Sequence, residues 1–364
     1  MHQKRLGDMA SYVNGYAFKP EQRGKVGLPI IRIQDLTGNV YDLGFYDGDY
    51  PKKVEINDGD VLISWSASLG VYEWNRGKAL LNQHIFKVVF DKLTVDKKFF
   101  MYAVKYKLEE MESKAHGATM KHITKKDFDN TVISFPTIVE QERISNTLNK
   151  LHTIIDSKKF QLEKLDNLIK ARFVEMFGDN FGEIVELGNV CDVRDGTHDS
   201  PKYHNEGYPL VTSKNICNGK IDFSTCNLIQ KEDYDKINKR SKVEIGDILM
   251  PMIGTVGNPI IINTNNEFAI KNVALIKFKD NSVILNTFVK ALLESDYFGR
   301  AVLSKTKGGT QKFISLGDIR KLELNLPPIE LQNQFAAFVA QVDKSKFALR
   351  KSIISLMNLW YNIN

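Results

Sequence analysis

The chain contains the stretch Gly117-Ala118-Thr119-Met120-Lys121-His122-Ile123, and it repeats this stretch with variations as Gly308-Gly309-Thr310-Gln311-Lys312-Phe313-Ile314. After each copy comes a short run typical of a β-strand, then a proline, Pro136 or Pro327, and then a long amphipathic segment. The same order of signals in both halves predicts two copies of one domain, each followed by one long helix.

Earlier landmarks repeat as well. Gly59-Asp60-Val61-Leu62 matches Gly246-Asp247-Ile248-Leu249, and Leu6-Gly7 matches Leu187-Gly188. The distance between matching landmarks grows along the chain, which indicates small insertions in the second copy. Solenoid units repeat every ~20–50 residues. A repeat of this length therefore indicates a duplicated domain with two similar binding surfaces.

The composition is that of a globular protein. The 364 residues are 43% hydrophobic and 26% charged, and the net charge of +6 permits a polyanionic partner without requiring one. The three cysteines form no Cys-x-x-Cys pair, which argues against a disulfide scaffold and a zinc site. Residues 1–8 lack the apolar core of a signal peptide, and no apolar run approaches the ~18 residues of a membrane span. We therefore expect a cytoplasmic protein with no membrane partner.

The expected fold class is α+β, with two similar mixed α/β domains joined by two long helices. Each domain, or lobe, combines β-rich runs with one amphipathic helix, expected near Asp96–Lys114 in the first lobe and Leu285–Ser304 in the second. The predicted boundaries are 1–136 for the first lobe, 137–179 for its helix, 180–327 for the second lobe and 328–364 for the last helix.

Both long segments carry an apolar seam, with residues at steps of three and four as in a coiled coil. Each helix would be about 50–60 Å long at ~1.5 Å per residue, and its apolar stripe needs a partner. We expect an antiparallel coiled coil and a pseudo-two-fold symmetric molecule; the alternative is that each helix packs on its own lobe. The predicted seam consists of Leu148, Leu151, Ile155, Leu162, Leu165 and Ile169 in the first helix, and of Phe338, Val342, Leu349 and Leu356, with Ser345, Ser352 and Leu359 between and after them, in the second.

A search for catalytic constellations finds none. Asn325-Leu326-Pro327-Pro328-Ile329 approaches the Asn-Pro-Pro-aromatic signature of adenine methyltransferases, but Leu326 interrupts it and no aromatic residue follows. Gly254-Thr255-Val256-Gly257 lacks the glycines and the lysine of a phosphate-binding loop. The histidines have no metal-ligand spacing. We expect no catalytic residue, no metal site and no cofactor bound by this chain.

Loops rich in hydrogen-bond donors occupy matching places in the two lobes. Arg and Lys pair with guanine edges, Asn and Gln with adenine, and Ser and Thr with phosphate. The copies keep their apolar frame and differ most in these polar tips, as two different DNA half-sites would require; the alternative is that exposed loops are polar everywhere. The candidate DNA-contacting residues are Ser64, Ser68, Asn82, Gln83, Lys114, Thr119, Lys121 and His122 in the first lobe, and Arg194, Thr197, His198, Ser213, Lys214, Asn215, Lys307, Thr310, Gln311 and Lys312 in the second.

The order of these motifs resembles the specificity subunit of type I restriction-modification enzymes. The resemblance covers essentially the whole chain, and its strength lies in the order and duplication of short motifs. The two copies differ at Thr137, which matches Pro328, and at Asn82-Gln83, which matches Lys271-Asn272. The motifs are Lys4-Arg5-Leu6-Gly7-Asp8, Asn14-Gly15-Tyr16-Ala17-Phe18, Gly59-Asp60-Val61-Leu62, Asn82-Gln83, and the run from Pro327 to Gln334 with its first-copy counterpart from Pro136 to Ile144.

The resemblance implies a non-catalytic subunit whose lobes are target recognition domains, each reading one half of a bipartite site in double-stranded DNA. The coiled coil would set the gap between the halves and dock two methyltransferase subunits, which use S-adenosylmethionine to methylate adenine. Restriction subunits, two in a full complex, can join in the cytoplasm of a prokaryote. Two alternatives stay open: a coiled-coil DNA-binding decoy, or a protein-interaction scaffold that acts without methyltransferase partners.

Overall fold

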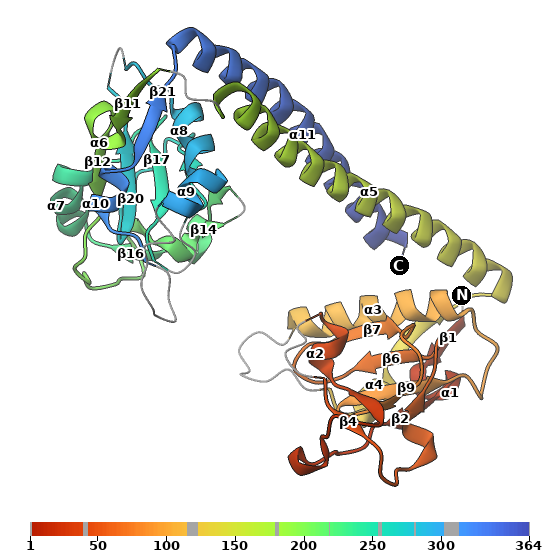
Figure 1. The fold of residues 1–364 in the computed structure, drawn as a ribbon. Helices are drawn as coiled ribbons and strands as arrows, with labels where there is room; N and C mark the ends of the chain where they lie inside the picture. The colour runs from red at the N-terminus through yellow and green to blue at the C-terminus, as the bar shows by residue number, and fades with distance from the viewer. Residues whose placement is uncertain are drawn as a thin grey trace. The chain divides into compact units, whose positions relative to one another are not determined.

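The computed structural model describes residues 2–38, 43–114, 123–178, 182–217, 219–253, 257–279, 282–301 and 313–363. The chain forms two compact units, of which the first comprises Met1–Lys158 with Ser352–Asn364 and the second comprises Lys159–Lys351. Each unit contains one mixed α/β lobe and a part of both long helices (Figure 1). The compact units therefore divide the long helices between them, whereas the sequence suggested a separate segment for each helix.

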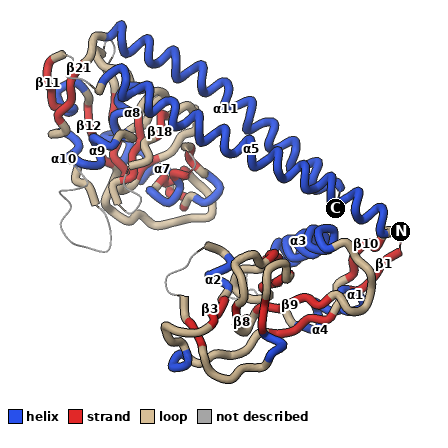
Figure 2. Tube along the Cα trace, turned by 45° about the vertical axis from the view of Figure 1, so that its right-hand side comes forward, coloured by secondary structure: helices blue, strands red, loops and turns tan. Residues whose placement is uncertain are grey.

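The first lobe is built from two small sheets and a ribbon (Figure 2). One sheet is antiparallel in the order β2-β9-β6-β7, and the other, in the order β4-β3-β8-β5, contains the parallel pair β3 and β8. The ribbon pairs the first strand, β1, with β10, which leads into the first long helix. The elements are β1 (His2–Arg5), α1 (Leu6–Met9), β2 (Ser11–Asn14), η1 (Pro20–Gln22), β3 (Leu28–Ile31), α2 (Ile33–Leu36), β4 (Phe45–Tyr46), η2 (Lys52–Val54), β5 (Glu55–Ile56), β6 (Val61–Ser64), β7 (Gly70–Glu73), β8 (Ala79–Leu81), β9 (Ile85–Val89), α3 (Lys97–Lys114), α4 (Lys125–Asn130) and β10 (Val132–Phe135).

An aromatic core joins the antiparallel sheet of the first lobe to its helices. Phe86, Phe100 and Phe128 are buried in one cluster. Tyr12 packs edge-on against Phe128, with 4.9 Å between ring centroids, and its hydroxyl donates to the carbonyl oxygen of Leu6 at 2.9 Å. Burial raises the pKa of Tyr12 far above its ordinary value, so the hydroxyl stays a donor. The core thereby ties α1 and α4 to strand β2.

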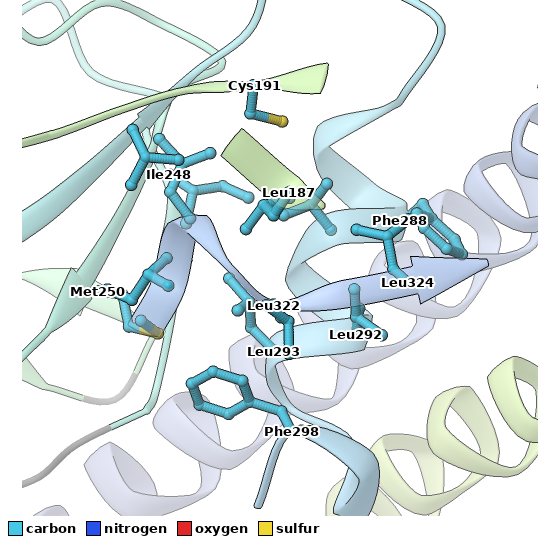
Figure 3. Packing of buried hydrophobic residues seen from close by; sticks show 14 of the residues in the cluster. Leu187, Cys191, Ile248, Met250, Phe288, Leu292, Leu293, Phe298, Leu322 and Leu324 are labelled. Carbon is cyan, nitrogen blue, oxygen red and sulfur yellow. The ribbon is translucent and has the colours of Figure 1, made fainter. Parts of the chain in front are cut away.

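The second lobe repeats most of this arrangement. Its antiparallel sheet has the order β12-β20-β17-β18, a second sheet in the order β16-β13-β19 contains the parallel pair β13 and β19, and a ribbon pairs β11 with β21. Figure 3 shows part of its core, where Phe288, Leu292 and Leu324 pack together. The elements are β11 (Glu183–Glu186), α6 (Leu187–Val190), β12 (Asp192–Asp195), β13 (Tyr208–Val211), η3 (Ser213–Asn215), β14 (Ile216–Cys217), β15 (Lys220–Ile221), η4 (Phe223–Thr225), β16 (Asn227–Ile229), α7 (Lys231–Ser241), β17 (Ile248–Pro251), β18 (Ile260–Ile261), β19 (Ala269–Ile270), β20 (Val273–Lys277), α8 (Asn286–Leu293), α9 (Asp296–Ala301), α10 (Leu316–Arg320) and β21 (Glu323–Leu326).

The repeated Gly-Asp landmark builds the same turn in both lobes. Gly59 has φ of 90° and Gly246 has φ of 91°, the left-handed region that glycine adopts without strain. The carboxylates of Asp60 and Asp247 each accept a backbone N–H of this turn and pair with a lysine of the neighbouring strand. The sequence match at this landmark therefore reflects a structural requirement of the frame.

The lobes differ in one inserted helix and one broken helix. Among the described residues of the first lobe, α7 has no helical counterpart longer than the short turn η2, so α7 is an insertion that helps explain the growing distance between landmarks. The helix expected over Leu285–Ser304 is interrupted after Leu293, where the hydroxyl of Ser295 donates to the carbonyl of Leu292 at 2.6 Å and α9 begins. The corresponding first-lobe helix, α3, is continuous as expected.

The two long helices pack together and run in opposite directions. Arg172 of α5 lies over the ring of Phe338 of α11, and Asp166 of α5 pairs with Lys346 of α11 at 2.5 Å. Within the second unit, residues earlier in α5 therefore contact residues later in α11. The two helices are antiparallel, as the seam predicted. The helices are α5 (Ile138–Phe177) and α11 (Ile329–Ile363).

The seam residues are buried or half-buried along both helices. In the first unit, Leu148 and Leu151 pack with Trp360 and Leu356. Toward the end of α11 the more buried residues lie one position later than expected, because the 3.6-residue helical period drifts against a seven-residue repeat. Two further seam residues are buried, Ile155 and Val342. The others are half-buried: Leu162, Leu165, Ile169, Phe338 and Leu349. The seam positions expected for Ser345, Ser352 and Leu359 are taken by Lys346, Ile353 and Trp360.

A buried glutamine fixes the start of each long helix. Gln332 and Gln141 each donate to the carbonyl oxygen of the proline that precedes the helix, at 2.8 and 2.9 Å. Gln332 also donates to the Val283 carbonyl at 3.0 Å and accepts the N–H of Leu285 at 2.8 Å, while Gln141 accepts the N–H of Asp96 at 2.9 Å. Each long helix is therefore anchored to the neighbouring helix of its own lobe.

Candidate nucleic-acid interface

In each lobe, two chain segments meet where strands of the two sheets end, and we call this place the platform. The first-lobe platform consists of residues 14–17, at the end of β2, and 82–84, after β8. The second-lobe platform consists of residues 195–198, at the end of β12, and 271–272, after β19. An isolated parallel bridge joins the two segments in both lobes. The platforms therefore occupy equivalent places in the two copies.

Close backbone contact requires glycine in both platforms. A Cβ atom at Gly15 would lie 2.0 Å from the carbonyl oxygen of Asn82, and one at Gly196 would lie 2.2 Å from the carbonyl oxygen of Ile270, the residue before the facing segment. The facing segments contain His84 with φ of 71° and Asn272 with φ of 53°, a conformation that few residues other than glycine adopt. The glycine, the bridge and one left-handed residue thus recur in both platforms, although the facing segment is one residue shorter in the second lobe, and the side chains that the platforms present are different.

The first-lobe platform presents amides beside an aromatic pair. Gln83 is exposed, and Asn82 is 8% exposed with an Oδ1 atom that has no hydrogen-bond partner among the described residues. The ring of His84 lies 4.9 Å from the ring of Trp65. The N–H of Ile123 donates to the carbonyl of Trp65 at 3.1 Å, so the end of the repeated Gly-x-Thr stretch reaches the same place.

In the first lobe, a tight turn follows β6. Ser64 is fully buried, and its hydroxyl donates to the carbonyl oxygen of Ser68 at 2.5 Å, while Ser68 itself is exposed. In the second lobe, the N–H of Ile314 donates to the carbonyl of Met252 at 3.0 Å. The second copy of the repeated stretch therefore also ends against the turn that follows its central strand.

The second-lobe platform adjoins the end of the parallel pair β13 and β19. The N–H of Lys271 donates to the carbonyl of Val211 at 2.9 Å, which places the turn after β13 next to the platform. In that turn Lys214 is exposed and Ser213 is half-buried. Asn215 is buried, and its side chain accepts the backbone N–H that opens the turn at 2.8 Å.

Ionic contacts surround the second-lobe platform. Arg194 pairs with Asp192 at 2.5 Å and donates to the carbonyl of Arg240 at 2.8 Å. The hydrogen bond between Arg194 and Asp192 raises the pKa of the guanidinium and lowers that of the carboxyl. Arg240 pairs with one carboxylate oxygen of Asp195, and His198 contacts the other. The charges of Arg194 and Arg240 are therefore partly satisfied within the lobe.

The structure sorts the candidate DNA-contacting residues by accessibility. Ser68, Gln83, His198 and Lys214 are exposed, and Arg194, Thr197 and Ser213 are half-buried. Ser64, Asn82 and Asn215 are buried, and the side chains of Ser64 and Asn215 close turns by bonding backbone groups. Thr119, Lys121, His122, Lys307, Thr310, Gln311 and Lys312 lie outside the described residues, as does the side chain of Lys114.

The candidate residues did not include several polar groups of the platforms. Tyr16, Lys271 and Asn272 lie on the platform segments, and Arg240 reaches the second platform from α7. Aligning the two copies on Gly15 and Gly196 would have marked Tyr16, which stands opposite Thr197, and the match of Asn82-Gln83 with Lys271-Asn272 already pointed to the other two. Arg240 carries no such signal, since α7 is an insertion.

The described ranges contain no group of three His, Cys, Asp or Glu side chains placed to hold a metal ion. Within the same ranges, no helix is long and apolar enough to cross a membrane. Burial raises the pKa of the Cys191 thiol to about 12 and that of Cys226 to about 11. Both side chains therefore stay protonated at neutral pH, which disfavours thiolate chemistry.

Comparisons with known proteins match both halves of the chain. The family model described as type I restriction modification DNA specificity domain matches residues 1–167 and again residues 182–358. The type I restriction enzyme EcoBI specificity subunit of Escherichia coli is 25% identical, over 97% of this chain and 80% of the relative. The MjaVIII specificity subunit of Methanocaldococcus jannaschii is 24% identical, over 85% of this chain and 79% of the relative.

Solved structures share the fold. The S subunit of a type I restriction-modification system from M. genitalium has a TM-score of 0.51 at 17% identity, with 100% of this chain and 94% of that chain covered. A chain from a study of type I R-M complex assembly has a TM-score of 0.57 at 18% identity, with 100% and 96% covered. The expected architecture of two mixed α/β domains joined by two packed helices is confirmed. Because the family model covers both copies, this chain belongs to the type I restriction-modification specificity family and is a non-catalytic DNA specificity subunit.

Proposed function

We propose that each lobe reads one half of a bipartite site in double-stranded DNA, using its platform and the repeated loop that ends beside it. The observation that carries this proposal is the occurrence of one backbone arrangement twice with different side chains. A shared frame presents side chains at equivalent places, and different side chains on it select different bases. Two such readers in one chain specify two unlike half-sites.

The chemistry of the platforms supports two half-sites of different character. The first platform offers the neutral amides of Asn82 and Gln83, and amides of this kind pair with both polar atoms of an adenine edge. The second platform and its adjoining turn offer Lys271 and Lys214, and cationic side chains suit guanine edges and phosphate. We therefore assign base reading at these places to Gln83 in the first lobe and to Lys271 in the second.

The turns beside the platforms supply supporting contacts. Ser68 and Lys214 are exposed at the turns that follow β6 and β13, where a hydroxyl or an ammonium group can bond phosphate. Ser64 and Asn215 hold these turns in shape, so we assign them to the frame and not to the contact surface. The net charge of +6 favours a polyanion without fixing its sequence.

We further propose that α5 and α11 dock two methyltransferase subunits, that these partners bind S-adenosylmethionine, and that restriction subunits join the same complex. The support is that apolar side chains remain exposed on both helices outside the seam through which the helices pack on each other. Phe160 and Val174 of α5 and Phe347 and Ile354 of α11 are each more than half exposed. Exposed apolar side chains in this number favour a protein partner.

Single-molecule mapping of adenine methylation tests the DNA-reading proposal. Genomic DNA of the source organism is compared with the gene intact, deleted, and deleted but complemented by the wild-type chain. The expected result is that methylation at one bipartite motif disappears on deletion and returns on complementation. An unchanged methylation pattern after deletion would contradict the proposal.

Co-purification with the methyltransferase subunit tests the docking proposal. Phe347→Glu places a charge on the exposed helix surface, and we expect it to reduce recovery of the complex at least tenfold, because a central apolar contact commonly contributes more than ~1.4 kcal/mol. Val26→Glu is the matched control, because Val26 is equally exposed but belongs to the first lobe and not to the long helices. Equal recovery of the two variants would remove the docking assignment at Phe347.

A further inference from the structure

One side chain of the second-lobe platform is held from both sides. The Nε2 atom of His198 lies 2.8 Å from a carboxylate oxygen of Asp195, and its Nδ1 atom lies 2.8 Å from the amide oxygen of Asn272. Asp195 belongs to the first platform segment and Asn272 to the second. His198 therefore links the two segments through its side chain, in addition to the backbone bridge.

The charge state of His198 decides whether this link is complete. Both partners present oxygen atoms, and an oxygen accepts a hydrogen bond from an N–H group only. A neutral imidazole donates one N–H and keeps its second contact only if the Asn272 amide turns to donate its own N–H. The imidazolium donates to both oxygens and adds an ionic contact with Asp195. These two hydrogen bonds, to Asn272 and to Asp195, raise the pKa of His198 above its ordinary value of 6.5.

The surroundings of His198 contain charges of both signs. Partial burial and the charge of Arg240 lower the pKa of His198, and the hydrogen bonds to Asn272 and Asp195 outweigh both effects. A cavity of about 360 Å³ separates the turn that carries His198 from α7. The charged groups on the elements around the imidazole are Asp195 at the end of β12, Asp199 on its own turn, Lys271 after β19, and Asp233, Lys236 and Arg240 on α7.

The first lobe lacks this link in its described part. Asn14 and Ala17 occupy the places that correspond to Asp195 and His198, because they stand at the same distance from the platform glycine. Alanine has no side-chain donor, and the described part of the first lobe has no counterpart of α7. The two platforms thus share a backbone but not the histidine link, which gives the molecule an internal control.

We propose that His198 is a positioning residue for the second half-site: by bridging Asp195 and Asn272 it fixes the turn that carries Thr197 against Lys271, so that discrimination at one half-site, and not at the other, depends on the imidazole proton. The proposal rests on the proposed function of the platforms as DNA readers. His198 acts through its neighbours, and Lys271 is further tied to this turn by a hydrogen bond from its ammonium group to the Ser200 hydroxyl at 2.6 Å.

The direction of the pH effect follows from the raised pKa. A histidine whose pKa is raised in the folded state contributes its stabilisation fully below its unfolded value and loses it as the pH rises through the folded value. The link is therefore strongest below the ordinary pKa of 6.5 and weakens as the pH rises through the raised value of the folded state. The ring is largely solvent-exposed, so the effect has the size of an exposed ion pair, about two- to fivefold in a binding ratio.

The test uses the full chain in complex with its methyltransferase subunits. Affinity is measured by fluorescence anisotropy for the cognate duplex and for two duplexes that each carry a base change in one half-site, at constant ionic strength, at about pH 6 and about pH 8.5. The expected result is that the discrimination ratio for one half-site falls about two- to fivefold on raising the pH, while the ratio for the other half-site stays constant.

Two variants make the assignment specific. His198→Gln removes the titrating group, and we expect its discrimination ratios to be independent of pH. His204→Gln, another histidine of the same lobe, is the matched control and should keep the wild-type pH dependence. A pH-independent wild-type ratio at both half-sites, or a pH effect that survives in His198→Gln, would overturn the role of His198. Loss of discrimination at both half-sites at every pH would instead overturn the DNA-reading function itself.

Discussion

The first and second lobes share most of their strand arrangement, yet their platforms are held in different ways. In both, a glycine lies against a facing carbonyl, and a bridge joins the two segments. The second platform adds side-chain contacts through Asp195, His198 and Arg240, whereas the first has Asn14 and Ala17 and no helix like α7 among its described residues. The comparison indicates that the two copies kept one frame while the side-chain contacts of the platforms diverged.

The platform glycines provide the strongest way to break the shared frame. Gly15→Ala and Gly196→Ala each place a methyl group about 2 Å from a backbone carbonyl, and the backbone must move to relieve the overlap. We expect the free energy of unfolding to fall by about 2–4 kcal/mol in either variant, measured by urea denaturation. Gly24→Ala is the control, since its nearest contact would be an ordinary 3.7 Å. If Gly15→Ala or Gly196→Ala lost no more unfolding free energy than Gly24→Ala, that glycine would not be required by the shared frame.

The buried glutamines test whether the two helix anchors are equivalent. Gln332→Leu leaves two carbonyls and one N–H without their partner, whereas Gln141→Leu leaves one of each. At about 1–3 kcal/mol for each buried group left unpaired, less what water recovers, we expect losses of about 2–4 kcal/mol for Gln332→Leu and about 1–3 kcal/mol for Gln141→Leu. Thermal and urea unfolding measure both.

The exposed Gln334 supplies the control for this pair of variants. Gln334→Leu lies two residues after Gln332 on the same helix and should change stability by less than ~0.5 kcal/mol. Equal losses in Gln334→Leu and Gln332→Leu would show that the apolar substitution itself, and not the hydrogen bonds of the anchor, causes the effect.

The smallest expected effect concerns phosphate contact by the second lobe. Lys214→Ala removes one exposed ammonium group beside the platform, and we expect the slope of log affinity against log salt to fall by about 1 for the assembled complex. Lys351→Ala, an equal change of charge on α11, should leave the slope unchanged. Identical slopes for wild type and Lys214→Ala would place the phosphate contacts elsewhere.

Much of the fold followed from the sequence because the repeat is visible in residues with structural roles. Gly59 and Gly246 mark a turn that needs a positive φ, and the prolines before the long helices mark their starts. The seam of α5 was also evident, since leucine and isoleucine recur at coiled-coil spacing. Such features depend on short stretches of chain, which a sequence shows directly.

Other features depended on contacts between distant segments. The predicted contact residues Ser64 and Asn215 close turns, because a short polar side chain bonds nearby backbone groups as readily as a ligand. The helix breaks after Leu293, where Ser295 starts a new helix. The apolar periodicity continues across this point and therefore predicted one unbroken helix. The contribution of Arg240 arises from an insertion that folds back on the platform, which no repeat could indicate.

The central claim is that the two platforms read two separate half-sites. The most direct measurement is single-molecule methylation mapping in cells that carry Gln83→Ala or Lys271→Ala in place of the wild-type chain. We expect Gln83→Ala to relax the base specificity at one half of the bipartite motif and Lys271→Ala to relax it at the other half, with the gap between the halves unchanged. If both variants altered the same half, or if neither altered the motif, the claim would be contradicted.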